Sequence, residues 1–105
     1  MELDINTIKN EIKKINELYE PQGFKIVSIF GSYARNEADI FSDIDLTYKI
    51  NHDKFFKDDG FAKLNKITEI KQDLERTFKR KVDLIPINVT NKIIKEQIQK
   101  EQIAI

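Results

Sequence analysis

Two long stripes of apolar residues at helical spacing place the strongest constraint on the fold of this chain. In residues 3–19 and again in residues 61–78, apolar side chains recur at steps of three and four, which is the pattern of an amphipathic helix. A third, shorter stripe follows Thr90 and Asn91, either of which can cap a helix. All three stripes need an apolar surface to pack against, and a small β-sheet supplies one. The sequence therefore predicts an α+β fold, a small mixed sheet with helices packed mainly on one face.

Segments rich in β-forming residues separate the stripes. Residues 24–30 are apolar on both alternating faces, which predicts a central strand covered on both sides. Residues 44–50 alternate apolar and polar side chains, the pattern of a strand with one buried face. Further strands are expected at residues 81–87 and 103–105, and a short helix is expected after Gly31.

Charged and turn-forming residues fill positions 51–60, which predicts a surface loop. Two aromatic residues in this segment, Phe55 and Phe56, are expected to be exposed and to mark a contact surface. The chain shows no internal repeat, low-complexity stretch or linker, so its 105 residues are expected to form a single domain, 1–105.

Composition excludes several classes of protein. The 18 basic and 18 acidic side chains cancel, so the chain lacks the positive charge expected of a general nucleic-acid binder. It has no cysteine and one histidine, which excludes disulfide scaffolds, thiolate zinc sites and multi-histidine metal sites. No apolar run approaches the roughly 18 residues of a membrane span, and the first residues do not form a signal-peptide core. We therefore expect a cytoplasmic protein with no membrane contact.

Chemically reactive residues cluster where one predicted strand ends and the next begins. Gly31 ends an apolar strand and Ser32 begins a short helix, a turn that presents backbone N–H groups and a hydroxyl to an anion such as phosphate. Asp43 and Asp45 are two residues apart on an alternating strand, so both carboxylates leave the same face, about 6 to 7 Å apart at Cα. Such carboxylates repel each other unless a cation lies between them, and oxygen ligands favour Mg²⁺ or Mn²⁺.

Asp83 is a third candidate, because it lies within the apolar strand predicted at residues 81–87. An unpaired buried carboxylate is costly, which makes a purely structural role harder to accept. If this strand neighbours the one that carries Asp43 and Asp45, three carboxylates converge. That arrangement is typical of metal-assisted phosphoryl or nucleotidyl transfer.

Each of these features, taken alone, can also be explained by a structural role without any catalytic or binding function. A Gly-Ser after a strand is commonly just a turn, and an Asp-x-Asp pair is often a solvated strand end. Here Gly-Ser is followed, after ten residues, by Asp-x-Asp, and this pattern arises by chance in about one chain of this length in a thousand. The combination therefore favours the functional interpretation.

The segment from Gly31 to Leu46, GSYARNEADIFSDIDL, resembles the signature of the nucleotidyltransferase superfamily that includes DNA polymerase β and the aminoglycoside nucleotidyltransferases. The short chain is similar in length to the minimal nucleotidyltransferases, or MNT domains, which are commonly paired as antitoxins with a HEPN-domain toxin. The resemblance covers nearly the whole chain. It departs from the family pattern at residues 36–37, where many relatives have a glycine, and at residues 101–102, where a Glu-Gly is often found.

The resemblance implies a role for each matching residue. Gly31 and Ser32 would bind the β- and γ-phosphates of ATP. Asp43 and Asp45 would hold Mg²⁺ or Mn²⁺, and Asp83 would complete this metal site and help to deprotonate the incoming hydroxyl group.

Arg35 matches an arginine that is common in the family signature, and two roles remain open for it. It could contact the nucleotide phosphates or fix the loop, or it could be a structural ion-pair partner of Glu37 or Asp39. The two interpretations carry equal weight on the sequence.

The resemblance also implies the reaction: an enzyme that transfers AMP from ATP to a hydroxyl group and releases pyrophosphate. The acceptor would be a tyrosine of a HEPN toxin, which would make this chain the antitoxin. Two alternatives remain. One is a transferase for a small molecule such as an antibiotic, although such relatives usually carry an additional helical domain; the other is an antitoxin that acts by binding alone.

Overall fold

A computed structural model describes residues 3–39, 41–55, 60–88 and 90–105, with backbone only at residues 60–64. Along the chain its elements are α1 (Ile5–Tyr19), the 3₁₀ turn η1 (Glu20–Gln22), β1 (Phe24–Phe30), α2 (Gly31–Ala34), β2 (Ile44–Ile50), α3 (His52–Phe55), α4 (Gly60–Phe78), β3 (Val82–Pro86), α5 (Lys92–Glu101) and β4 (Ile103–Ala104). Within the described part of the chain, no helix is long and apolar enough to cross a membrane.

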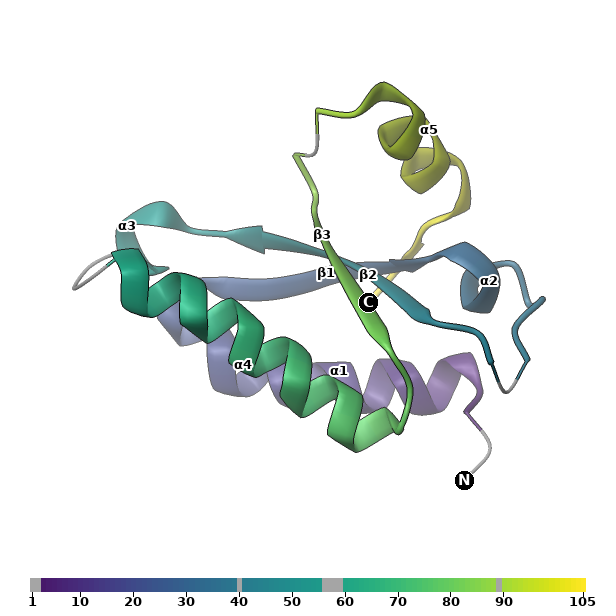
Figure 1. Cartoon of the computed structure of the whole chain (residues 1–105), viewed down its shortest axis with the longest axis horizontal. Helices are drawn as coiled ribbons and strands as arrows, with labels where there is room; N and C mark the ends of the chain where they lie inside the picture. Colours follow the sequence, from purple (N-terminus) through teal and green to yellow (C-terminus); the bar gives the residue numbers. More distant parts are fainter. Residues whose placement is uncertain (1–2, 40, 56–59, 89) are drawn as a thin grey trace.

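The four strands form one mixed sheet in the order β3-β2-β1-β4. Strand β1 runs antiparallel to both β2 and β4, whereas β2 and β3 are parallel. The helices α1 and α4 lie together on one face of the sheet, and α5 lies on the opposite face (Figure 1). The predicted α+β fold with a small mixed sheet is confirmed, and β1 is a central strand.

Local capping explains where the helices begin and end. Asp4 caps α1 by accepting a 2.7 Å hydrogen bond from the Thr7 N–H, and Gly23, at φ +91°, turns the chain out of η1 into β1. Asn91 caps α5 by accepting a bond from the Ile94 N–H. Of the two caps that the sequence allows for α5, the structure therefore selects Asn91.

The core lies between the sheet and the α1–α4 layer. The buried apolar side chains of both helices pack against one face of β1, β2 and β3, and the central members of this core are Ile8, Ile12, Ile26, Ile29, Ile44, Leu46, Ile70, Leu74, Phe78 and Val82. The opposite face of the sheet is more polar, and it is covered in part by α5, whose Ile98 is buried. This opposite face of the sheet carries the candidate functional residues.

A break in register explains why β1 is apolar on both alternating sets of residues. The pairing of β1 with β2 shifts between Ile26 and Ser28, so that Ile26 and Ile29 both belong to the core although they are three residues apart. Beyond this bulge, Phe30 pairs with Asp45.

The prediction of a surface loop at residues 51–60 is partly wrong. Residues 52–55 form the short helix α3, and Phe55 is buried, with 1% of its surface exposed. Its ring packs against that of Phe24, with the ring centroids 6.1 Å apart. The contact surface expected at Phe55 is therefore a core contact, because the apolar ring gains more from burial than from exposure. Phe56 lies outside the described residues.

Candidate active site

Asp45 and Asp83 are neighbours on adjacent strands. They are paired in register across the parallel strands β2 and β3, and side chains at paired positions leave the same face of a sheet. The pKa of Asp45 is raised to about 6, chiefly by burial and then by the charge of Asp83, a hydrogen bond with it and the charge of Asp43. The protein thus places two carboxylates side by side at an energetic cost.

Asp43 precedes β2 and is close enough for its charge to act on Asp45. It does not join Asp45 and Asp83 in a closed cluster: among the residues that the structure describes, no three acidic, histidine or cysteine side chains are gathered as ligands of one metal ion. The structure therefore brings together two of the three predicted carboxylates, with the third nearby.

Gly31 lies against the carboxylate of Asp45. It opens α2 with φ +76°, a conformation that residues with a Cβ rarely adopt. A Cβ at this position would overlap the Asp45 Oδ2 and lie only 3.0 Å from the Asp45 Cγ. A glycine is thus required both by the backbone angle and by the close approach of the carboxylate.

Ser32 follows Gly31 in the first turn of α2 and is partly exposed. Phe30 occupies the N-cap position and provides no side-chain hydrogen bond to this turn. Because the first N–H groups of a helix have no partner within the helix, the start of α2 can offer backbone donors to an anion. The start of α2 therefore lies beside the carboxylate of Asp45, which is paired with Asp83.

Arg35 forms two ion pairs. Its Nε donates to the Glu37 Oε2 at 3.0 Å and its Nη1 donates to the Glu101 Oε2 at 2.9 Å. These carboxylates raise the pKa of the guanidinium, and its positive charge opposes the rise in the pKa of Asp45. Of the two ion-pair partners expected from the sequence, Glu37 is observed.

Asp39, the other expected partner, is used differently. Its Oδ1 accepts hydrogen bonds from the Phe41 N–H at 2.8 Å and from the Ser42 Oγ at 3.3 Å. These bonds shape the loop that leads to Asp43, so Asp39 has a structural role in this turn.

Sequence reasoning missed a buried polar network behind Asp45. The hydroxyl groups of Ser28 and Thr47, which are 1% and 0% exposed, lie 2.5 Å apart, and the Ser28 Oγ donates to the Gln102 Oε1 at 3.0 Å. Since Ser28 has a single hydroxyl proton, Thr47 must donate to Ser28. Two features of the sequence could have indicated this network. Ser28 lies within an otherwise apolar strand, and Thr47 is two residues after Asp45, on the same face of β2.

The carboxylates and the glycine suit a hard divalent cation. The donor set around Asp45 consists of carboxylate oxygens, the ligands that Mg²⁺ and Mn²⁺ prefer. The pKa of Asp45 is raised first by burial and then by the negative charges of Asp83 and Asp43, and a cation would neutralise those charges. The residues present therefore fit such an ion.

Comparison with known proteins agrees with this fold. The family model described as Polymerase beta, Nucleotidyltransferase, matches residues 10–105. A Methanocaldococcus jannaschii protein that carries the provisional name protein adenylyltransferase is 33% identical over 101 residues, which span 96% of this chain and 97% of the relative. The chain belongs to the polymerase β-like nucleotidyltransferase family.

Solved structures show the same fold. A protein described as a minimal nucleotidyltransferase matches with a TM-score of 0.70 and 24% identity, over 98% of this chain and 97% of the other. A toxin–antitoxin crystal structure with AMP-PNP matches with a TM-score of 0.67 and 22% identity, over 91% of this chain and 70% of the other. A Shewanella oneidensis complex of a tri-AMPylated HEPN toxin with an MNT antitoxin gives a TM-score of 0.59 at 21% identity, over 91% of this chain and 66% of the other.

Proposed function

We propose that this nucleotidyltransferase is an antitoxin that transfers AMP from ATP to a tyrosine hydroxyl of a HEPN-domain toxin. Membership of the family supports the reaction class. The name of the M. jannaschii relative and the AMPylated toxin in the Shewanella complex support a protein acceptor and AMP as the transferred group. The structure with AMP-PNP supports an adenine nucleotide as the donor.

The observation that carries the proposal is the pairing of Asp45 with Asp83 beside Gly31. We assign Asp45, Asp83 and Asp43 as the residues that hold Mg²⁺ or Mn²⁺. Such an ion orients a triphosphate and stabilises the negative charge that develops on it during transfer. A structural role alone would not explain two carboxylates kept side by side, one of which, Asp45, has a raised pKa.

Gly31 and Ser32 are assigned to the phosphates of the nucleotide. Gly31, at a positive φ, brings the start of α2 against the carboxylate of Asp45, and backbone N–H groups at a helix start suit phosphate oxygens. Arg35, one turn later, adds a positive charge that already acts on Asp45. Its ion pairs with Glu37 and Glu101 hold the guanidinium near the site.

In the proposed reaction, the acceptor oxygen attacks the α-phosphorus of ATP and forms a new ester bond. The bond between the α-phosphorus and the bridging oxygen breaks, and pyrophosphate leaves with the electron pair of that bond. The proton of the acceptor hydroxyl passes to a carboxylate, for which we assign Asp83 because it is paired with Asp45 across β2 and β3.

Mass spectrometry of a co-expressed toxin tests the proposal. Wild-type enzyme should add the mass of one adenylyl group to the partner for each AMP transferred, and Asp83→Asn should add none. Asp53→Asn, which changes an exposed aspartate on α3, is the matched control and should act as wild type.

The two alternative functions give different results in the same experiment. An unmodified toxin that is neutralised equally well by wild type and Asp83→Asn indicates an antitoxin that acts by binding alone. An unmodified and fully active toxin, together with AMP transfer to an added small molecule, indicates a small-molecule transferase.

A further inference from the structure

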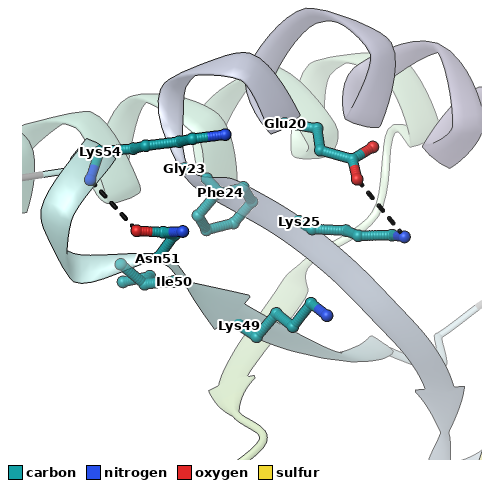
Figure 2. A pocket seen from close by; sticks show the side chains of 8 residues that line it. All are labelled: Glu20, Gly23, Phe24, Lys25, Lys49, Ile50, Asn51 and Lys54. Atoms are coloured by element: carbon teal, nitrogen blue, oxygen red, sulfur yellow. Dashed lines mark hydrogen bonds and ion pairs between the residues drawn. The ribbon is translucent and has the colours of Figure 1, made fainter.

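A pocket of about 370 Å³ lies at the end of the sheet where β1 begins and β2 ends. Its size falls within the range of ligand pockets. Figure 2 shows the residues that line it: Glu20, Gly23, Phe24, Lys25, Lys49, Ile50, Asn51 and Lys54. Three of these eight residues are lysines and one is acidic.

This pocket is separate from the candidate active site. Lys49 lies four residues beyond Asp45 on β2, which corresponds to about 13 Å at the rise of a strand. None of the candidate catalytic residues lines it. A ligand bound here would therefore not need the carboxylates.

Two of the lysines face each other across the sheet. Lys25 on β1 and Lys49 on β2 are directly paired in the antiparallel register, and like charges at such positions destabilise a sheet. Figure 2 shows the side chains of Lys25, Lys49 and Lys54 around this pocket, with the ammonium group of Lys25 beside Glu20. The chain as a whole has no net charge. The excess of positive charge at this pocket is therefore local and does not reflect a basic protein.

The negative charge available within the described residues does not balance these lysines. Lys25 pairs with Glu20 at 3.6 Å, but both side chains are about half exposed, at 42% and 57%, and such pairs contribute little. Neither Lys49 nor Lys54 has an ion-pair partner in the part of the chain that the structure describes. An anion bound between the lysines would remove this repulsion.

The backbone around the pocket is held in place. The Asn51 N–H donates to the Gly23 carbonyl at 2.8 Å, and the Phe55 N–H donates to the Asn51 carbonyl at 2.8 Å. A Cβ on Gly23 would lie 2.8 Å from the Phe55 nitrogen and 2.9 Å from the Lys54 Cβ, so α3 is packed directly onto this turn. Lys54 therefore extends from a fixed position and loses less freedom on binding.

We propose that this lysine pocket binds a phosphate-bearing anion, independently of the divalent cation at the aspartates. Phosphate groups offer several acceptor oxygens and up to two negative charges, and lysine ammonium groups bind them as point charges. The phosphates could belong to a small phosphorylated molecule or to the backbone of RNA, and the chemistry of recognition is the same.

The test is the binding of inorganic tripolyphosphate to the full chain in EDTA, measured by calorimetry at low salt. EDTA removes divalent cations, so the aspartates should not contribute. We expect wild type to bind. The double variant Lys49→Gln/Lys54→Gln should bind with an affinity lower by a factor of about ten or more, given the Coulomb energy of two charges. Lys13→Gln/Lys92→Gln changes two exposed lysines on α1 and α5, has the same net charge, and should bind as wild type.

Thermal unfolding gives a second readout that does not depend on calorimetry. Tripolyphosphate should raise the Tm of wild type and of the control variant, but not that of Lys49→Gln/Lys54→Gln. Absence of binding by wild type, or equal loss of affinity in the two double variants, would overturn the proposal.

A twelve-nucleotide RNA separates the two sources of phosphate. RNA that binds wild type and is displaced by tripolyphosphate supports the proposal and identifies a nucleic-acid backbone. Binding of tripolyphosphate without binding of RNA also supports it and identifies a small phosphorylated molecule.

Discussion

The side-chain amide of Asn16, on α1, bonds to both peptide groups of Ile26, on β1. The Ile26 N–H donates to the Asn16 Oδ1 at 2.8 Å, and the Asn16 Nδ2 donates to the Ile26 carbonyl at 3.0 Å. Ile26 stands at the register shift of β1, where the strand ladder leaves peptide groups without strand partners. Asn16 thus fixes the bulge. The bulge in turn brings Phe30 opposite Asp45 and places Gly31 next to Asp45.

Asn16→Ala should destabilise the protein strongly. The change leaves two buried peptide groups without partners, so we expect a loss of about 2–4 kcal/mol in the free energy of unfolding. Urea unfolding followed by circular dichroism measures it. Asn10→Ala, at an exposed position on the same helix, should cost less than about 0.5 kcal/mol; similar losses in the two variants would contradict a role in fixing the bulge.

Gly31→Ala should be destabilising mainly because of Asp45. The added Cβ meets the carboxylate and occupies a positive φ, for which we expect a cost of about 2–3 kcal/mol in the free energy of unfolding. In an Asp45→Ala background the carboxylate is absent, so the same change should cost about 1 kcal/mol, the strain of the backbone alone. Ser32→Ala is the control and should alter stability little. Equal costs in both backgrounds would show that the close approach is unimportant.

Asp45→Asn should stabilise the metal-free protein at neutral pH. The pKa of Asp45 is raised from 3.8 to about 6 in the folded state, so the folded state binds more protons than the unfolded state between these values. Wild-type stability therefore falls as pH rises from about 4 to about 6 and stays lowered above that range. Because the carboxyl group is partly exposed, solvent screening reduces the gain from Asp45→Asn to about 1 kcal/mol.

Urea unfolding of wild type and Asp45→Asn at pH 4 and pH 7.5, in EDTA, measures this effect. The two proteins should differ at pH 7.5 and converge toward pH 4. Glu17→Gln removes an exposed carboxyl group of α1 and should reproduce wild type at both values. A wild-type stability that rises over this interval relative to Asp45→Asn would contradict the raised pKa.

Nucleotide binding should depend on a divalent cation. Calorimetry with ATP should detect little binding in EDTA and recovery with Mg²⁺ or Mn²⁺, because phosphates and carboxylates repel each other unless a cation lies between them. Asp43→Asn should abolish transfer and leave the fold intact, since Asp43 is partly exposed. Undiminished transfer by this variant would exclude Asp43 from the metal site.

Arg35 and Glu101 allow the two roles of the arginine to be separated. Both Arg35→Gln and Glu101→Gln remove the same partly exposed ion pair and should each cost less than about 1 kcal/mol of stability. If Arg35 also contacts phosphate, Arg35→Gln alone should weaken the binding of ATP with Mg²⁺ about tenfold. Equal affinities in the two variants would leave Arg35 a purely structural role.

Much of the fold was predictable because periodicity is a local property of the sequence. The stripes at residues 3–19 and 61–78 and the alternation at residues 44–50 each reflect burial against one surface, and α1, α4 and β2 follow them closely. The turn chemistry at Gly31 was equally visible. Asp43 and Asp45 are two residues apart, and this spacing alone predicts that both carboxylates leave one face of a strand.

What could not be predicted depends on contacts between distant segments. Phe55 looked exposed because its neighbours are charged, but it packs against Phe24, which precedes it by about thirty residues. Glu101 and Gln102 reach Arg35 and Ser28 only because β4 returns to the edge of β1. The bulge at Ile26 depends on a single amide from another element.

The parallel pairing of β2 with β3 has a consequence for how the protein becomes active. The two strands are separated in sequence by α3 and α4, and parallel pairing across such a crossover is non-local and slow to form. A nascent chain that has not yet completed β3 contains Gly31, Ser32, Asp43 and Asp45 but lacks the second carboxylate of the pair. We therefore expect catalytic competence to appear abruptly, late in synthesis and folding, rather than to grow with the amount of helix and sheet already formed.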